Sequence, residues 1–257
     1  MRENKQNLFG KEYFEGGKNS NFKKGYNWDS AYFHLRPIAN SLNKTIKPRT
    51  ALDIGCAKGY LVYLLNSIGI NSYGVDVSNY AVSQARAEIK EKLYVLDIEE
   101  DTFPFPEARF DLIILLEVLE HLNNFDHLLN EITRLLSKDG YVVISTPPPH
   151  GRGAKNDKTH INLHPKKFWV ELFNRCGLIL VKDDVWRYFK KTFLEELIKI
   201  MPENPPSTKI SLILTKMGWC GNFIRNNVFP YIDYFSPLRS GEILLFRKIE
   251  RGNESGN

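Results

Sequence analysis

Short apolar segments alternate with amphipathic ones from residue 50 onward, and this alternation restricts the chain to few folds. Strands are expected at 50–54, 71–77, 93–96, 110–116, 141–145 and 178–185, and helices at 60–68, 80–89, 125–136 and 165–176. Strands that alternate with helices of about 10–15 residues indicate a doubly wound, mainly parallel sheet. The sequence therefore predicts an α/β fold.

Acidic side chains stand at or just past the ends of four of these strands. They are Asp53, Asp76, Asp97 and Glu117. Because binding sites of doubly wound sheets lie at the carboxyl ends of the strands, these four acids outline one side of an expected cleft. An acid in this position can also simply cap the next helix, and that alternative stays open for each of them.

The segment ALDIGCAKGY at 51–60 is a glycine-bracketed turn after a strand. A dinucleotide-binding turn needs a small residue where this chain has Tyr60, and the phosphate-binding pattern GxxxxGK[ST] is absent. Asp53, two residues before Gly55, would repel a pyrophosphate. The turn therefore favours a nucleoside that carries an ammonium or sulfonium charge.

Further motifs follow this turn in order: YGVDVS, VLDI, FPFPEARFDLI and LEVLEHL. Together with DIGCAKG they resemble the motifs of class I S-adenosylmethionine-dependent methyltransferases over about residues 50–185. LEVLEHL is similar to the segment in ubiquinone-biosynthesis O-methyltransferases and in many small-molecule and sugar methyltransferases. The resemblance implies a Rossmann-like sheet of seven strands, with the last strand at 242–248.

The same resemblance implies a cofactor site for S-adenosylmethionine. Its expected residues are Asp53, Gly55, Cys56 and Gly59 at the methionine end, Asp76 and Val77 at the ribose, Asp97 and Ile98 at the adenine, and Leu116 and Glu117 beside the cofactor. Ala57 stands where the family often has a glycine, and Lys58 is expected to point to solvent.

Methyl transfer to a hydroxyl oxygen benefits from a base, and histidine suits that task. The candidates are His160, then His121, with His164 third; each can instead have a structural role. The spacing of histidines and acids gives no support for a metal site, so none is expected.

Two additions flank or interrupt the expected core. The predicted organisation is an aromatic and basic N-terminal extension or cap at 1–48, a methyltransferase domain at 49–186 plus 240–250, a helical insertion at 187–239 and a disordered tail at 251–257. The insertion is a candidate acceptor cap or homodimer surface.

Charge leaves the acceptor class open. Residues 1–50 carry a net +6, residues 51–147 a net −8 and residues 148–257 a net +7, so basic arms flank an acidic centre. The preferred function is methyl transfer to an oxygen of a small molecule, such as a sugar or related metabolite. The alternatives are an RNA or protein methyltransferase that uses the arms and a cofactor-binding module without catalysis.

Three observations bear on the partners and the cellular location of the protein. The motif Asn/Asp-Pro-Pro-aromatic, which the resemblance would associate with methylation of base amino groups, is absent after the fourth strand, so a nucleic-acid partner is not favoured. No apolar run approaches the roughly 20 residues of a membrane span. Three cysteines at unrelated spacings indicate a reducing, cytoplasmic location.

Overall fold

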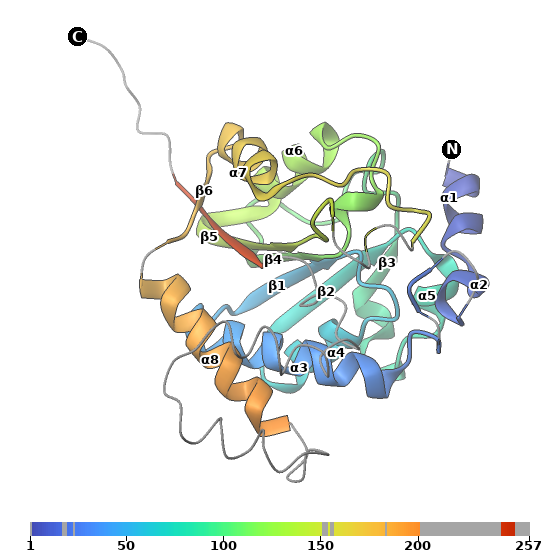
Figure 1. The fold of residues 1–257 in the computed structure, drawn as a ribbon, viewed down its shortest axis with the longest axis horizontal. Helices are drawn as coiled ribbons and strands as arrows, with labels where there is room; N and C mark the ends of the chain where they lie inside the picture. The colour runs from blue at the N-terminus through green and yellow to red at the C-terminus, as the bar shows by residue number, and fades with distance from the viewer. Residues whose placement is uncertain are drawn as a thin grey trace.

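The computed structural model describes residues 2–16, 20–22, 24–150, 154, 157–182, 184–200 and 243–249. In this part of the chain, a single sheet lies between two layers of helices (Figure 1). Its strands are β1 (Thr50–Ile54), β2 (Asn71–Asp76), β3 (Leu93–Val95), β4 (Phe110–Leu116), β5 (Leu136–Ser145), β6 (Leu178–Leu180) and β7 (Leu244–Lys248).

The sheet has seven strands in the order β3-β2-β1-β4-β5-β7-β6. Strands β1 to β5 pair in parallel, and β7 is antiparallel to both β5 and β6. The predicted seven-stranded, mainly parallel sheet is therefore confirmed. The chain order reverses between β1 and β4, which is where doubly wound sheets place their sites.

Strand β4 lies at the centre of the sheet and is apolar on both faces. Leu112 and Ile114 belong to the core on one side of the sheet, whereas Ile113 and Leu115 belong to the core on the other. Side chains alternate along a strand, and helices cover both faces, so an unbroken apolar run is needed here.

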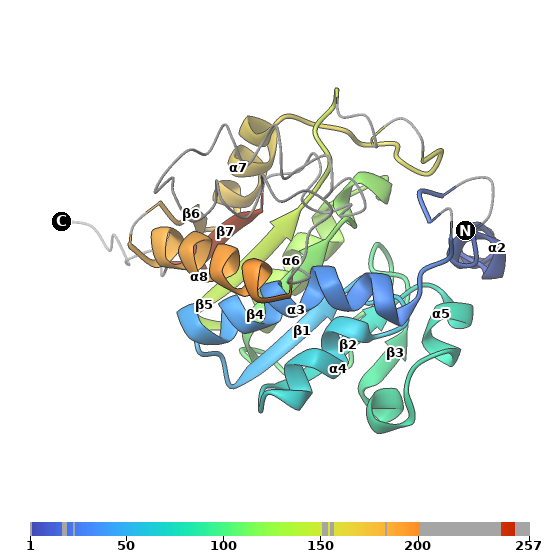
Figure 2. The ribbon, with the colours of Figure 1, turned by 60° about the horizontal axis from the view of Figure 1, so that its bottom comes forward.

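Helices α3 (Trp28–Thr45), α4 (Tyr60–Ser67) and α8 (Asp184–Ile200) cover one face, and α6 (Asp126–Leu135) and α7 (Lys166–Arg175) cover the other (Figure 2). A polar contact joins α3 to α8. Lys44 Nζ lies 2.6 Å from Glu196 Oε1, and Asn40 Nδ2 donates to Glu196 Oε2 at 2.7 Å. The first part of the expected insertion is thus a helix packed on the domain.

Two expected elements differ from the structure. The helix predicted at 80–89 is divided into α5 (Asn79–Ser83) and a 3₁₀ helix η1 (Ala87–Lys92), because Arg86 between them is extended. The Arg86 guanidinium stacks over the rings of Trp28 and Tyr63, at 4.3 and 4.5 Å from their centres, which holds it in that conformation.

The strand predicted at 178–185 ends early, at Leu180. It is an edge strand with one neighbour, and its three residues pair with Phe246, Arg247 and Lys248 of β7. Helix α8 begins soon afterwards, at Asp184. Expectations for residues 201–242 and 250–257, including most of the insertion and the tail, lie outside the described residues.

The N-terminal extension packs against the sheet's carboxyl edge. It contains α1 (Arg2–Leu8) and α2 (Lys11–Phe14) ahead of α3. Ser78 Oγ donates to the Phe9 carbonyl at 2.5 Å, and Lys58 Nζ lies 2.8 Å from Glu15 Oε1. The expectation that Lys58 points to solvent is therefore wrong, because its side chain is buried and paired with the extension.

None of the helices in the described part of the chain combines the length and apolar character that crossing a membrane requires.

Gly55 and Gly69 offer a matched test of the turn after β1. Both have a positive φ, of 77° and 87°, but a Cβ on Gly55 would lie 2.4 Å from Val118 Cγ2, whereas a Cβ on Gly69 would meet nothing within 4 Å. We expect Gly69→Ala to lower the free energy of unfolding by about 1–2 kcal/mol, because only the backbone strain of a positive φ is added there. Gly55→Ala should cost a further ~1–3 kcal/mol, because Val118 must move. Urea unfolding measures both, and equal losses would contradict the close approach.

Candidate active site

A cavity of about 1140 Å³ opens at the carboxyl edge of the sheet, beside β1, β2 and β4. The sequence-predicted residues that line it are Asp53, Gly55, Cys56, Asp76, Val77, Asp97, Ile98, Leu116, Glu117, His121 and His160. Gly59 and His164 are not among the lining residues. The cleft predicted from the strand-end acids is therefore present, with all four of them at its wall.

The turn after β1 is fixed to the end of β2 by backbone hydrogen bonds. The Gly55 and Cys56 amides both donate to the Val75 carbonyl, at 2.8 and 3.1 Å, and the Ala57 amide donates to Asp76 Oδ2 at 2.8 Å. Ala57 has a φ of 50°, a left-handed conformation that costs an alanine free energy. This explains why glycine is common at that position in related turns.

Gly59 supports the turn from behind. It caps helix α4 with a φ of 72°, and a Cβ there would lie 2.6 Å from Ile89 Cδ1 and 2.7 Å from Leu93 Cδ1. Its position in the structure indicates close packing of the turn on η1 and β3.

Asp53 and Asp76 are both buried at the wall of the cavity. Burial raises the pKa of Asp53 well above its usual range, and the charge of Asp76 raises it further. Burial also raises the pKa of Asp76, although backbone amides of Ser78 and Ala57 oppose the shift. Two neighbouring buried carboxylates lower their free energy when a cation binds beside them, so this part of the cavity suits a positively charged ligand.

Asp97 is buried at the end of the cavity next to β3 and is held by the N-terminal helix. Lys5 Nζ donates to both Asp97 carboxylate oxygens, at 2.8 and 2.7 Å, and lies 2.7 Å from Glu99 Oε2. Burial alone would lower the pKa of Lys5, but the hydrogen bonds with these two acids raise it overall. A lysine of α1 therefore binds the carboxylate that is expected beside adenine.

Glu117 follows β4 with a φ of 56°, an uncommon conformation for a residue with a side chain. Ser145 Oγ donates to its Oε1 at 2.9 Å. Burial raises the pKa of Glu117 to about 7, against the effect of this hydrogen bond. Strained backbone of this kind is frequent at functional sites.

His121 and His160 come together across the cavity wall, with ring centres 4.8 Å apart. Burial lowers the pKa of His121 to about 4, and the neighbouring His160 adds to the shift. His121 is therefore neutral at pH 7 and is a weak base. His160 lines the cavity beside it.

His164 lies apart from this pair. Its ring stacks on Phe168 with ring centres 3.7 Å apart, and it meets Trp169 edge to face at 5.5 Å. The contacts are those of a side chain that packs the start of α7.

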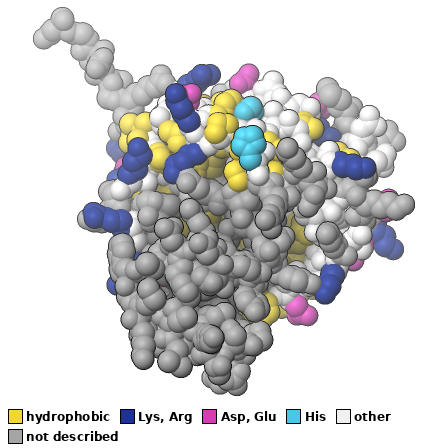
Figure 3. All heavy atoms as spheres, viewed as in Figure 1, with side chains coloured by type: hydrophobic (Ala, Val, Ile, Leu, Met, Phe, Trp, Pro, Cys, Tyr) yellow, Lys and Arg dark blue, Asp and Glu magenta, His cyan; other side chains and the backbone are white. Residues whose placement is uncertain are grey.

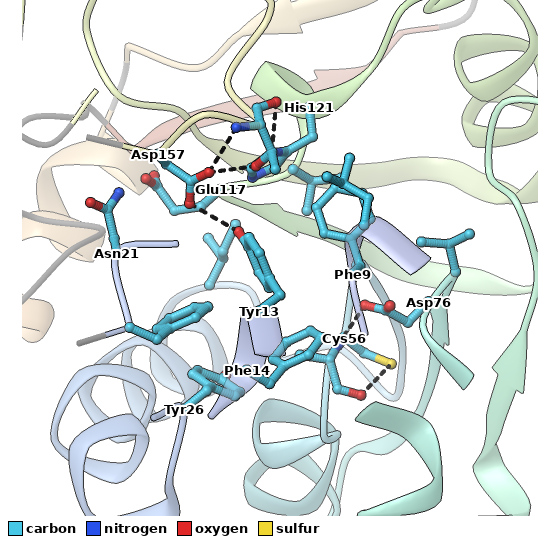
Figure 4. Close-up of a pocket in the computed structure, with 18 of the residues that line it drawn as sticks. Phe9, Tyr13, Phe14, Asn21, Tyr26, Cys56, Asp76, Glu117, His121 and Asp157 are labelled. Carbon is cyan, nitrogen blue, oxygen red and sulfur yellow. Dashed lines mark hydrogen bonds between the residues drawn. The ribbon is translucent and has the colours of Figure 1, made fainter. Parts of the chain in front are cut away.

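Aromatic side chains from the N-terminal extension line the cavity between the acids at its two ends (Figure 4). They are Phe9, Tyr13, Phe14, Phe22 and Tyr26, and they contact one another in series. The Tyr13 hydroxyl donates to Asp157 Oδ2 at 3.1 Å, which joins the extension to the loop before α7.

Sequence reasoning missed three residues of this site: Lys5, Glu120 and Asp157. Glu120 stands within LEVLEHL beside His121, and this adjacency of an acid and a histidine was an available signal. Lys5 contacts Asp97, which lies 92 positions further along the chain, so no local pattern could identify it.

Comparison with known proteins agrees with this geometry. Residues 52–144 match a family model described as a methyltransferase domain. The ubiquinone biosynthesis O-methyltransferase of Pelagibacter ubique is 27% identical over 50% of this chain and 57% of its own length. A probable tRNA (uracil-O(2)-)-methyltransferase of Caenorhabditis briggsae is 41% identical, over 26% of this chain and 13% of its own length. The chain spans about half the length of the first curated relatives it matches.

Solved structures share the fold. A SAM-dependent methyltransferase from Archaeoglobus fulgidus superposes with a TM-score of 0.52 at 17% identity, covering 86% of this chain and 98% of that one. Phosphoethanolamine N-methyltransferase 2 of Haemonchus contortus, bound to S-adenosyl-L-methionine, superposes with a TM-score of 0.50 at 22% identity. The superposition covers 93% of this chain and 56% of that one. At these identities the similarity establishes the fold alone. The match over residues 52–144 and the shared fold show that this chain is similar to S-adenosylmethionine-dependent methyltransferases.

Proposed function

We propose that this protein transfers the methyl group of S-adenosylmethionine to a hydroxyl oxygen of a small acceptor, such as a sugar or related metabolite. The observation that carries the proposal is the composition of the cavity. Two buried acids and a glycine-bracketed turn lie at one end, a buried acid–histidine cluster lies at the other, and aromatic side chains lie between them.

The residues at the first end fit the proposed cofactor. Each Asp76 carboxylate oxygen accepts one backbone hydrogen bond, from Ala57 or Ser78, and each retains a lone pair for a ribose hydroxyl. Asp53 and the turn would face the charged methionine end. In the proposed arrangement Val77 lies beside the ribose, Asp97 and Ile98 hold the adenine, and Leu116 and Glu117 flank the cofactor.

The cofactor supplies an activated methyl group, and the chain's task is alignment and removal of one proton. The acceptor hydroxyl gives its proton to water or a nearby base, and its oxygen forms a new bond to the methyl carbon. The carbon–sulfur bond breaks, and its electron pair remains on sulfur as the neutral thioether. We place activation of the hydroxyl at the end of the cavity formed by His121 and His160.

The size and walls of the cavity favour a small acceptor. Pockets for one drug-sized ligand have about 300–1,000 Å³, so a volume of about 1140 Å³ leaves room beside the cofactor for one compact molecule. Rings such as Tyr13 and Phe22 offer flat apolar faces, and the C–H face of a sugar ring can pack against them.

An RNA acceptor is the second candidate, favoured by the short match to the tRNA-named relative and by the basic arms. On the face seen in Figure 3, Lys and Arg side chains of the described residues lie at several points near the edge of the view. An RNA substrate predicts binding that weakens steeply with salt. A small neutral acceptor predicts little dependence on salt.

Transfer of a labelled methyl group tests the proposal. Incubation with methyl-labelled S-adenosylmethionine and a panel of sugars and sugar nucleotides should label at least one acceptor, and Asp76→Asn should bind the cofactor about 10- to 100-fold more weakly, because charge-assisted hydrogen bonds are lost. Labelling of RNA in place of small molecules would overturn the acceptor class. Cofactor binding with no transfer to either class would favour a binding module without catalysis.

Removal of the Lys5 ammonium should strengthen cofactor binding. If adenine uses Asp97, the ion pair between Lys5 and Asp97 must yield when the cofactor binds, so Lys5→Ala should raise the affinity several-fold. Lys11→Ala is the matched control, because Lys11 is exposed on the neighbouring helix α2. Calorimetry measures both variants. A weaker affinity in Lys5→Ala would show that Lys5 supports the bound cofactor and does not compete with it.

A further inference from the structure

Glu120 is an unusual side chain for the interior of this fold. It is 0% exposed, and neither of its carboxylate oxygens has a hydrogen-bond partner in the described part of the chain. Its backbone carbonyl accepts from the amides of Ile161 and Asn162, at 2.9 and 3.0 Å, so the residue is fixed against the loop before α7. A buried carboxylate without partners is costly, and either protonation or a bound cation removes that cost.

Two histidines lie against this carboxylate with defined orientations. His160 Nδ1 donates to the Ala154 carbonyl at 2.8 Å, and His121 Nδ1 donates to the carbonyl and hydroxyl oxygens of Thr159, at 3.2 and 2.8 Å. Because a carbonyl oxygen can only accept, both protons are on Nδ1. Each ring therefore keeps an Nε2 lone pair, which is the arrangement of histidines that bind a metal.

The loop before α7 also supplies outer support. Asp157 Oδ1 accepts from the Thr159 amide at 3.0 Å and from the Thr159 hydroxyl at 2.5 Å, and Asp157 Oδ2 accepts from Tyr13. Asp157 thereby holds Thr159, and Thr159 holds His121. Outer hydrogen bonds of this kind orient the inner ligands of metal sites.

The distances between these three side chains fit a shared metal ion better than direct hydrogen bonds between them. His160 Nε2 lies 4.0 Å from Glu120 Oε1, too far for a hydrogen bond, and one potential ligand atom from each residue lies within 4.8 Å of the others. Bonds of about 2.1 Å to a central cation require donors about 3–4 Å apart. Inward movements of under about 1 Å would complete such a site.

We propose that Glu120, His121 and His160 bind a divalent metal ion at the wall of the cavity. Two imidazole nitrogens and one carboxylate form a donor set that suits Zn²⁺, Mn²⁺ or Fe²⁺ and leaves coordination positions open. His121 and His160 line the cavity, and Glu120 lies behind them, so the open positions face the acceptor. This assignment reverses the expectation of no metal.

The proposed metal site also indicates which acceptors are suitable, and this inference rests on the proposed function. A cation with two open positions favours an acceptor that offers two neighbouring oxygens, such as a vicinal diol. The ion lowers the pKa of the coordinated hydroxyl, whose proton passes to water, and it stabilises the oxygen anion that attacks the methyl carbon. His160 then acts as a ligand, and no histidine has to accept the proton.

Metal titration of the full chain tests the site without any acceptor. After treatment with a chelator and its removal, titration with MnCl₂ or ZnCl₂ should show one saturable site per chain, and the ion should raise the unfolding temperature. Glu120→Gln and His160→Gln should each weaken binding at least tenfold, whereas His127→Gln on α6 should not. The histidine variant provides a second test if Glu120→Gln does not fold.

Two results would overturn the metal site: no saturable binding of either ion, or unchanged binding in both ligand variants. S-adenosylmethionine affinity, measured on the same samples without metal, separates this proposal from the proposed function. Cofactor binding without metal binding contradicts the metal site alone. Metal binding without cofactor binding contradicts the proposed methyl transfer and leaves the metal site supported.

Discussion

The Asp76 carboxylate is the contact on which the cleft depends. One of its oxygens accepts from the Ala57 amide, in the turn after β1, and the other from the Ser78 amide, at the start of α5. It therefore joins the carboxyl ends of β1 and β2, next to the point between β1 and β4 where the sheet's order reverses. Without this link the left-handed conformation of Ala57 would have no compensating hydrogen bond.

The buried acids determine which ligands the cleft can accept. Burial raises the pKa of both Asp53 and Asp76, and the charge of Asp76 raises that of Asp53 further. A phosphate-bearing nucleotide would add repulsion to this cost, whereas a sulfonium or ammonium group would relieve it. The same reasoning applies at the far end of the cavity, where the unpartnered Glu120 carboxylate favours a cation.

Local patterns predicted the parallel strands and the acids that line the cavity, whereas the seventh strand was implied by the family resemblance. The Asp53–Gly55 turn and the acids at 76, 97 and 117 are each specified by a few adjacent residues, because they follow directly from where a strand ends. Lys58 was assigned wrongly because its partner, Glu15, belongs to a distant segment. His121 and His160 could be named from the sequence, but only the folded loop brings both against Glu120.

The N-terminal extension gives the cleft its remaining wall. Its aromatic side chains enter the cavity, and its Lys5 engages Asp97. Entry of a cofactor at Asp97 would therefore displace a contact of α1, which couples the position of that helix to binding. No sequence pattern indicates that the position of α1 and ligand binding are coupled, because the coupling depends on the contact between Lys5 and Asp97 in the folded chain.

Calorimetric titration with S-adenosylmethionine, S-adenosylhomocysteine and NAD tests the central claim most directly, namely that the acids at the carboxyl edge select a nucleoside without phosphate. The account predicts saturable binding of both sulfur nucleosides, tighter for the sulfonium, and no binding of NAD. Binding of NAD, or failure of a folded sample to bind either sulfur nucleoside, would contradict it.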